Sequence, residues 1–365
     1  MNTKPHQQQK KRNTEPFNAE ISPLEIATQG WRPTFREIST QKAIPRDVKL
    51  RREGIYHFKE LIHTQPKEWL IKQFGPGKEY PVNVSKLIKN IIWQIRTRIV
   101  TGKLPPTQGL LRGFWYSYIK STLARADSLN HDVDQYSQMI KMFVRLVQYR
   151  NLMRYKDMGF VDDNENDRKI GINNHIILFA EKAGHFPLLK RIAEQTEVTI
   201  LSLGGQPSLL SAEYFVDEIK QQKIDIRKSF YTFSLVDYDT SGWIIRDAFL
   251  DDLRFYGVKH LQHKDLILPN IFTQEEIHLK KYPLPTPPEM EQKNKRWLKE
   301  SGGIDGKLYG LEVDAAPSQR IHELFNQEIK DLIESTEDIR KGRALLLLSN
   351  AIEDYILAKL QTEEA

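Results

Sequence analysis

Between residues 175 and 261 the sequence alternates short apolar runs with helical segments, and this pattern constrains the fold more than any other feature. The expected strands and helices alternate, in chain order, at residues 176–180, 185–195, 198–203, 209–221, 231–236, 244–256 and 259–261. Strands that alternate with helices of this length form right-handed crossover units and a parallel sheet. The sequence therefore predicts an α/β fold with a mainly parallel sheet. Beyond it, we expect one more strand at 309–314 and two amphipathic helices at 317–334 and 338–361.

Two of these strands end in carboxylates. Glu181 follows the first run, and Asp237 and Asp239 follow the run at 231–236. Alternate residues of an extended chain point to the same side, and open α/β sheets bind ligands at the carboxyl ends of their strands. Because Mg²⁺ prefers oxygen ligands, we expect Glu181, Asp237 and Asp239 to form a Mg²⁺ site. The alternatives are that the Asp pair forms a turn or a helix cap and that Glu181 begins an exposed helix.

The net charge of +6 is distributed unevenly. Residues 1–52 contain eleven Lys and Arg against five Asp and Glu, and residues 80–126 contain eight basic residues and no acidic one. A basic block beside a carboxylate site is expected of an enzyme that acts on a polyanion, whereas a solvated basic face is the simpler alternative. The expected DNA-binding residues are Lys86, Lys89, Arg96, Arg98, Lys120 and Arg125.

Residues 79–172 are expected to form a DNA-binding module. Helical periodicity at 84–100, 107–119 and 132–153 is followed by a turn at Gly159 and a strand at 170–172. A basic group of short helices that closes on a strand is typical of a winged-helix domain. Ahead of it, residues 1–20 are too polar to form a core and predict a disordered basic tail. Residues 21–78, interrupted by prolines, are expected to form an N-terminal extension.

The order of these pieces resembles the A subunit of topoisomerase VI and its relative, the meiotic double-strand-break transesterase. Arg112-Gly-Phe-Trp-Tyr116 is similar to the family's Arg-x-x-aromatic-Tyr motif, and Ala180-Glu-Lys182 to its glutamate strand. Asp237-Tyr-Asp-Thr-Ser-Gly242 is similar to its Asp-x-Asp-Pro-x-Gly motif, with Thr240 in place of proline. The family's Gly-Lys-Gly-Tyr-Pro stretch corresponds to the shorter Gly204-Gly-Gln-Pro207, which lacks the lysine. The likeness covers roughly residues 84–280 and extends to the region 311–329.

The resemblance implies a multidomain protein in which a winged-helix domain precedes a Toprim domain at 173–281, with a helical C-terminal extension over 282–365. It implies that Tyr116 attacks DNA and forms a 5′-phosphotyrosyl link, that Arg112 favours the phenolate and binds the phosphate, and that the three acids hold Mg²⁺. It also implies a homodimer on double-stranded DNA, in which Tyr116 of one subunit works with the metal of the other. A topoisomerase of this type would need a separate GHKL-type ATPase B subunit, because the chain carries no nucleotide-binding motif.

Other interpretations of the same residues stay open. A metal-dependent nuclease, as in bacterial plasmid-defence complexes, would use the same acids with water as the nucleophile, and a DNA-binding scaffold would keep the fold without cleaving. Tyr118 competes with Tyr116 as the nucleophile, and aromatic clusters on helices usually belong to the core. His185, His260 and His263 match no helix-borne zinc motif, and we expect them at the surface or at helix caps.

Composition limits the setting in which the protein works. The chain has no cysteine, which excludes disulfides and thiolate metal sites. Its apolar runs are much shorter than a membrane span, and its N-terminus lacks a signal-peptide core. We therefore expect a soluble protein without a membrane partner, cytoplasmic and nucleoid-associated in a prokaryote or mobile element, or nuclear in a eukaryote.

Overall fold

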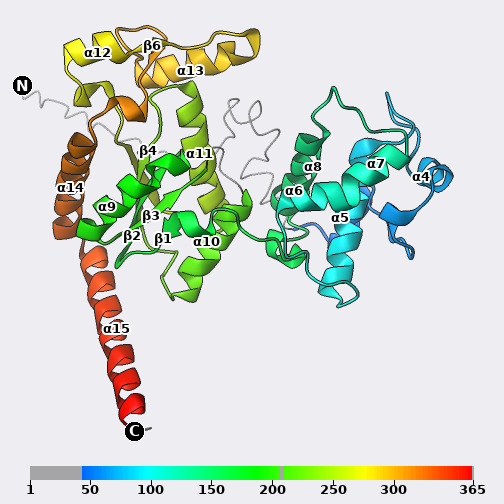
Figure 1. The fold of residues 1–365 in the computed structure, drawn as a ribbon, viewed down its shortest axis with the longest axis horizontal. Helices are drawn as coiled ribbons and strands as arrows, with labels where there is room; N and C mark the ends of the chain where they lie inside the picture. Colours follow the sequence, from blue (N-terminus) through cyan, green and yellow to red (C-terminus); the bar gives the residue numbers. More distant parts are fainter. Residues whose placement is uncertain (1–42, 205–208, 364–365) are drawn as a thin grey trace, which may run out of the picture.

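The computed structural model describes residues 43–204 and 209–363. These residues form two lobes, a helical N-terminal lobe (residues 43–160) and a larger sheet lobe (Figure 1). The expected disordered tail at 1–20 and most of the stretch at 204–207 lie outside the described residues. The helical segments of the N-terminal lobe are α3 (Arg46–Arg52), η1 (Ile62–Thr64), α4 (Lys67–Phe74), α5 (Val84–Val100), α6 (Leu111–Phe114), η2 (Trp115–Lys120), α7 (Ser121–Arg125), α8 (Gln135–Val144), η3 (Arg145–Tyr149) and η4 (Tyr155–Met158).

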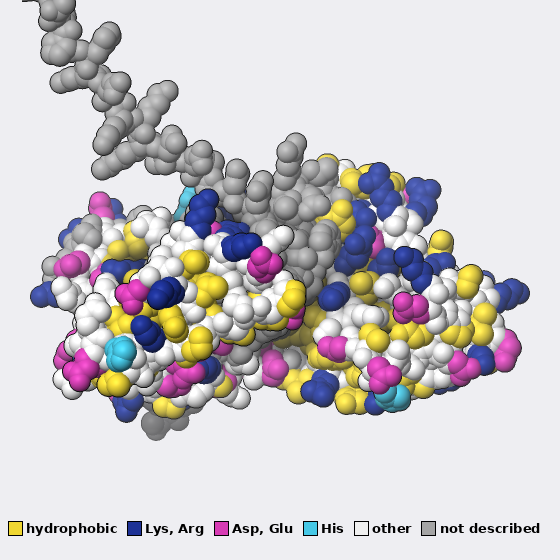
Figure 2. Space-filling model, turned by 90° about the horizontal axis from the view of Figure 1, so that it is seen from above, with side chains coloured by type: hydrophobic (Ala, Val, Ile, Leu, Met, Phe, Trp, Pro, Cys, Tyr) yellow, Lys and Arg dark blue, Asp and Glu magenta, His cyan; other side chains and the backbone are white. Residues whose placement is uncertain are grey.

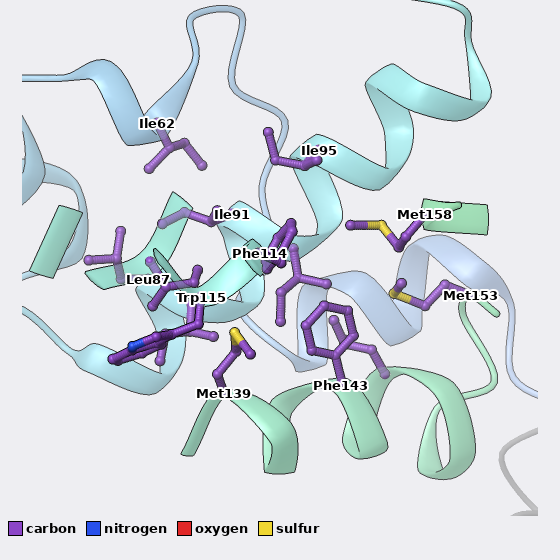
Figure 3. Close-up of a cluster of buried hydrophobic side chains, with 14 of the residues drawn as sticks. Ile62, Leu87, Ile91, Ile95, Phe114, Trp115, Met139, Phe143, Met153 and Met158 are labelled. Carbon is purple, nitrogen blue, oxygen red and sulfur yellow. The ribbon is translucent and has the colours of Figure 1, made fainter. Parts of the chain in front are cut away.

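The N-terminal lobe has one continuous core. Ile62 and Phe74 from its first part pack in the same apolar cluster as Leu87, Phe114 and Phe143 (Figure 3). The boundary expected at residue 78 therefore does not separate two cores. The α5 helix begins where the sequence predicts it, because the side chain of Asn83 accepts a hydrogen bond from the N–H of Lys86 at 3.0 Å and so caps the helix.

The strand expected at 170–172 as part of a winged helix was wrong. Residues 43–167 contain no strand, and β1 (Arg168–Lys169) pairs antiparallel with a strand of the main sheet. Gly171 permits a close approach here, because a β-carbon at this position would lie 2.2 Å from the carbonyl oxygen of Glu197. The chain at this position passes closely over the end of the sheet and continues directly into it.

The sheet lobe confirms the α/β prediction with a mainly parallel sheet. Its strands are β1, β2 (Asn173–Ala180), β3 (Val198–Ser202), β4 (Phe230–Leu235) and β5 (Leu261–Asp265). Their order is β1-β3-β2-β4-β5, and all neighbours are parallel except β1 and β3. A separate two-stranded sheet pairs β6 (Tyr282–Pro283) with β7 (Tyr309–Gly310). Of the strand expected at 309–314, only these first two residues are strand.

Helices cover both faces of the main sheet (Figure 1). They are α9 (Phe186–Thr196), α10 (Leu209–Gln221), α11 (Thr240–Phe255), α12 (Gln274–Lys280), α13 (Glu291–Ser301), α14 (Ser318–Ser335) and α15 (Glu337–Glu363). Along β2, Ile176 and Leu178 pack into the cluster on the side of α9 and α14, whereas Ile177 and Phe179 pack into the cluster on the side of α10 and α11. A strand buried on both faces must be apolar throughout, which is why this run is so clear in the sequence.

The two lobes are joined through α10. Its first residues, Leu209 and Leu210, belong to the core of the N-terminal lobe. Further along α10, the carboxylate of Glu213 accepts hydrogen bonds from the backbone N–H groups of Tyr155 at 3.1 Å and Lys156 at 3.0 Å. Because these bonds are buried and directional, they fix one lobe against the other. Among the described residues, no helix is both long and apolar enough to cross a membrane.

Candidate active site

The carboxyl ends of β2 and β4 bring two of the predicted acids together. The two strands are parallel neighbours, and Ala180 pairs in register with Leu235. The backbone N–H of Glu181 donates to the carbonyl oxygen of Leu235 at 3.1 Å. Glu181 and Asp237 therefore leave adjacent strands at the same edge of the sheet, the edge at which open α/β sheets bind ligands.

Asp239 is fixed at the start of α11. It is the N-cap residue, and its carboxylate accepts a hydrogen bond from the N–H of Gly242 at 2.6 Å. Its second oxygen accepts a hydrogen bond from the hydroxyl of Tyr282 at 2.7 Å. Burial raises the pKa of Asp239 in spite of these hydrogen bonds, and the charge of Asp237 adds to the rise. Gly242 is needed for this turn, since a β-carbon there would lie 2.3 Å from the carbonyl oxygen of Asp237.

Asp237 has partners for both of its oxygens. One accepts a hydrogen bond from the backbone N–H of Val313 at 2.8 Å, and the other lies 3.1 Å from the ammonium of Lys182. Burial alone would lower the pKa of Lys182, but its hydrogen bond and ion pair with Asp237 outweigh this and raise it. The same ammonium lies 3.8 Å from Asp314. Lys182, the residue after Glu181, therefore supplies positive charge to this acidic edge.

Glu181 is the member of this group that lacks compensation. Its Oε2 atom is buried and has no hydrogen-bond partner in the described parts of the chain. Burial raises the pKa of Glu181 to about 7, and the charges of Asp237 and Asp239 add to the rise. A carboxylate in this state is costly to keep ionised. The site would therefore be stabilised by a bound cation.

The residues suit Mg²⁺ in their chemistry, although they are not arranged as ligands in this conformation. Within residues 43–204 and 209–363, no three His, Asp or Glu side chains stand close enough to hold a metal ion. A carboxylate has about four lone-pair sites, so the hydrogen bonds to Asp237 and Asp239 leave room for a ligand bond. Metal-binding carboxylates usually carry such additional hydrogen bonds. For Asp237 to bind a cation, Lys182 would have to withdraw from it.

A second layer of polar residues supports the edge, and most of it was not predicted from the sequence. His185 is buried, and its Nε2 atom lies 3.0 Å from the carboxylate of Asp314. The hydrogen bond with His185 lowers the pKa of Asp314. His185 stands at the N-cap position of α9, one of the two places expected for it, although it is buried, and His260 is exposed as expected. For His263 the expectation was wrong, because it lies within β5, partly buried and 2.9 Å from Asp265. Asp314 and Tyr282 carry no motif of their own and arrive from distant segments, so only folding reveals them.

Tyr116 is presented on the surface of the N-terminal lobe. It lies in η2, a π-helical segment that continues α6, and its side chain is 51% exposed. The residues before it, Phe114 and Trp115, are buried in the core shown in Figure 3 and anchor the segment. The competing Tyr118 packs its ring at 4.9 Å from both His63 and Phe114. Of the two tyrosines, Tyr116 is the one available to a large substrate.

Arg112 lies on the same surface but does not bond to Tyr116. Its guanidinium lies 5.9 Å from the ring centre of Tyr136, and its side chain is exposed. The ammonium of Lys120 lies 5.1 Å from the ring centre of Tyr116. Of the two cations, only Lys120 therefore lies over the ring of Tyr116, whereas Arg112 lies over that of Tyr136.

Tyr116 and the acids are in different lobes of one chain. In Figure 1, α6 and α7, which flank η2, lie in the N-terminal lobe at right, whereas β2 and β4 lie in the sheet lobe. No contact described between the two lobes joins Tyr116 to Glu181, Asp237 or Asp239. A shared reaction centre would therefore require a second protomer or a movement of the lobes.

The expected DNA-binding residues divide into two groups. Lys89 is bonded to the buried Glu53 at 2.8 Å, and Arg96 is bonded to Asp157 at 2.7 Å. Lys89 and Arg96 therefore form ion pairs within the lobe. The others lie nearer the surface: Lys86, Arg98, Lys120 and Arg125, of which Arg98 and Arg125 bond to backbone carbonyls. Figure 2 shows several Lys and Arg side chains gathered over this lobe, at right in the view.

Comparisons with known proteins give no assignment. No model of a known protein family matches the chain, and no curated protein matches it. The function must therefore be argued from the residues and their geometry.

Proposed function

We propose that this protein is a Mg²⁺-dependent DNA-cleaving transesterase similar to the A subunits of type IIB topoisomerases. The observation that supports the proposal most is Glu181, a carboxylate with a buried, unpartnered oxygen at the sheet edge beside Asp237 and Asp239. Acids at the ligand-binding edge of such a fold, one of them with a buried oxygen that lacks a partner, are typical of a functional site. The sheet lobe would be a Toprim domain, and the N-terminal lobe a helical variant of the family's tyrosine-bearing domain.

In the proposed reaction, the phenol oxygen of Tyr116 forms a bond to a DNA phosphorus as the bond to the 3′ oxygen breaks. The phenol proton is lost, the 3′ oxygen gains a proton, and the 5′ phosphate remains linked to the protein. Glu181, Asp237 and Asp239 would hold Mg²⁺, which supplies charge neutralisation at the phosphate oxygens. Lys120 lies over the ring of Tyr116 and would favour the phenolate, and Arg112, exposed four residues before Tyr116, would bind the phosphate.

The separation of the lobes fits a homodimer in which each site combines two chains. Tyr116 of one protomer would face the acids of the other, and one dimer would cut both strands of a duplex. Strand passage would need a separate GHKL-type ATPase subunit. Without that subunit, the chain would cleave DNA but not relax it in an ATP-dependent way.

The test is to incubate the protein with supercoiled DNA and Mg²⁺, denature the mixture, and measure protein attached to 5′ ends. We expect an adduct with the wild type and with Tyr118→Phe, none with Tyr116→Phe, and none with Asp239→Asn. Tyr118→Phe is the matched control because it removes a neighbouring phenol from the same segment. An adduct that persists in Tyr116→Phe would refute the assignment of the nucleophile.

A second function, a metal-dependent nuclease with water as the nucleophile, is favoured by one observation. Within a single chain, the acids lie in a different lobe from Tyr116 (Figure 1), and water needs no such partner. In that case Tyr116→Phe would still cut DNA, the products would carry no protein, and Asp239→Asn would abolish cutting. The same experiment therefore separates the two functions.

A further inference from the structure

A groove of about 390 Å³ opens on the N-terminal lobe, between α5 and the chain segment that precedes η1. Residues 56–59 form one wall, and side chains from residues 93–103 form the other. A volume of this size is typical of a site for a small ligand. No acidic residue is among the described residues that line the groove, and the aromatic and basic ones include Tyr56, His57, Lys59, Trp93, Arg98 and Lys103.

Hydrogen bonds between the two walls fix the shape of the groove. The amide of the buried Gln94 donates to the carbonyl oxygens of Phe58 at 3.0 Å and Glu60 at 2.6 Å. The guanidinium of Arg98 donates to the carbonyl oxygen of Lys59. A site whose walls are already held in place does not have to be ordered when a ligand binds, which favours affinity.

Three basic side chains of the groove have no counter-charge. Lys59, Lys103 and His57 are exposed, and within residues 43–204 and 209–363 their side chains form no ion pair or hydrogen bond. Together with Arg98, the two lysines give the groove three fixed positive charges. A cleft lined by charge of one sign concentrates ions of the other sign. The groove therefore favours an anionic ligand that carries more than one negative charge.

The aromatic rings of the groove have two different surroundings. Trp93 lies between other groups of the lobe, with the guanidinium groups of Arg46 and Arg96 at 4.9 Å and 5.3 Å from its ring centre. It therefore serves as a wall. Tyr56 is 51% exposed and has the ammonium of Lys86 at 5.2 Å from its ring centre. An exposed aromatic ring beside cations is the arrangement on which proteins stack nucleic-acid bases.

We propose that this groove binds a nucleotide, with the base stacked on Tyr56 and the phosphates paired with Lys59 and Lys103. A nucleotide joins a planar ring to negative charges, and the groove offers a complement to both. A free nucleotide and a nucleotide of an unpaired strand present this same chemistry. Base pairs of a duplex cover their ring faces by stacking on one another. The groove is therefore not suited to the duplex that the proposed reaction cleaves.

The groove is separate from the proposed reaction and does not depend on it. Trp93 lies two residues from both Ile91 and Ile95, about 200° around α5. Ile91 and Ile95 pack in the core with Phe114 (Figure 3), so the groove and the tyrosine-bearing η2 are on different faces of α5. The wall formed by residues 56–59 also lies outside the stretch that resembles the topoisomerase family.

Calorimetric titration of the full chain in EDTA tests the proposal with three probes. They are ATP, a 5′-phosphorylated strand of three thymidines, and inorganic triphosphate, which has the charge without a base. We expect ATP or the strand to bind about tenfold more tightly than triphosphate, or better, because base stacking adds to the attraction between charges. Tighter binding of ATP identifies a free nucleotide as the ligand, and tighter binding of the strand identifies an unpaired strand. Triphosphate that binds as tightly as both, or no binding of ATP and the strand, would overturn the proposal.

Exposed side chains provide variants that assign the binding to the groove. Tyr56→Ala should weaken the preferred probe about tenfold and leave triphosphate unchanged, whereas Lys59→Gln with Lys103→Gln should weaken both. Lys72→Gln is the matched control, because Lys72 is an exposed lysine on α4 that does not line the groove. If Tyr56→Ala binds the probe as tightly as the wild type, the proposal is wrong. Tyr116→Phe should keep nucleotide binding and lose the DNA adduct, so failure of this site and failure of the proposed reaction are separate results.

Discussion

Two clusters of buried charge, one in each lobe, differ in how well they are compensated. In the N-terminal lobe, Glu53 is fully buried and bonded to Lys89 at 2.8 Å, to Arg145 at 2.6 Å and to Arg150. Burial alone would raise the pKa of Glu53, but the hydrogen bonds from Arg145, Lys89 and Arg150 hold it at about 2. At the sheet edge the balance is reversed, since Glu181 lies near two other acids with one oxygen unpartnered.

The difference distinguishes a structural cluster from a site prepared for a ligand. A buried acid that is saturated with cations contributes to the native state and has no capacity left for a substrate. A buried acid with too little positive charge costs stability, and such a cost is expected where a ligand later supplies the charge. We therefore expect neutralising Glu53 to lower the stability of the protein and neutralising Glu181 to raise it.

The largest effect is expected from Glu53→Gln. The amide would leave Lys89, Arg145 and Arg150 close together without the carboxylate that they share, and breaking a buried pair in this way costs about 3–5 kcal/mol. Chemical denaturation should show a free energy of unfolding that is lower by this amount. Glu68→Gln on α4 is the control, because Glu68 is exposed and should change stability by less than about 0.5 kcal/mol. Equal stability of Glu53→Gln and wild type would remove the contrast between the clusters.

The next effect is a loss of stability in acid that depends on Glu53. Its pKa is about 2 in the folded chain against an ordinary value of 4.5. A lowered folded pKa stabilises the protein above the unfolded pKa, and this contribution is lost as the pH falls from about 4.5 to 2. The loss amounts to roughly 3 kcal/mol. About 2 kcal/mol of this is lost by pH 3, so unfolding free energies measured at pH 6 and pH 3 should differ by roughly 2 kcal/mol more in the wild type than in Glu53→Gln.

These two clusters also show what the sequence could predict. The acids of the sheet edge follow apolar strands, and strand periodicity together with parallel pairing is enough to place Glu181 beside Asp237. The Glu53 cluster has no such pattern. The cations that bond to Glu53 are Lys89 in α5, Arg145 in η3 and Arg150, the residue after η3. No sequence pattern links them, so Lys89 was predicted to bind DNA although its charge is paired with Glu53.

The residues of the sheet edge that were not predicted lack a local sequence pattern in the same way. Tyr282 and Asp314 reach the acids from segments 43 and 77 residues beyond Asp239 and Asp237, and no local period links them. The short β6–β7 pair, which the sequence analysis did not predict, sets the position of Tyr282. Local rules predicted the four parallel strands and most helices within a few residues, whereas contacts between distant loops depend on the packing of the whole lobe.

A moderate effect of opposite sign is expected from Glu181→Gln. The pKa of Glu181 in the folded chain is raised to about 7 from 4.5, so folding is penalised once the pH exceeds about 4.5, and the penalty is complete above 7. Because the residue is only partly buried, we expect a gain of roughly 1–3 kcal/mol for the variant at pH 8 and little difference at pH 5. Thermal unfolding without divalent ions at both pH values measures this.

Added Mg²⁺ should make the wild type more stable than Glu181→Gln, the reverse of their order without divalent ions. Binding to the folded state raises the melting temperature, and more so for tighter binding, and Glu181→Gln removes a ligand. We expect millimolar Mg²⁺ to stabilise the wild type and to leave Glu181→Gln unchanged, with Ca²⁺ as a second hard cation for comparison. A wild type that shows no response to either ion would mean that the acids are not a metal site.

The smallest effect is expected from Tyr282→Phe. The change removes the hydroxyl that donates to Asp239 at 2.7 Å and keeps the ring and the β6–β7 pairing. Asp239 retains its hydrogen bond from Gly242, so stability should fall by only about 1 kcal/mol. Mg²⁺ affinity should fall about tenfold, because a hydrogen bond to a ligating carboxylate fixes its orientation. Tyr309→Phe, on the paired strand β7, is the matched control. If Tyr282→Phe loses stability without losing Mg²⁺ affinity, Asp239 serves as a helix cap, and the acidic edge resembles the Glu53 cluster more than the comparison implies.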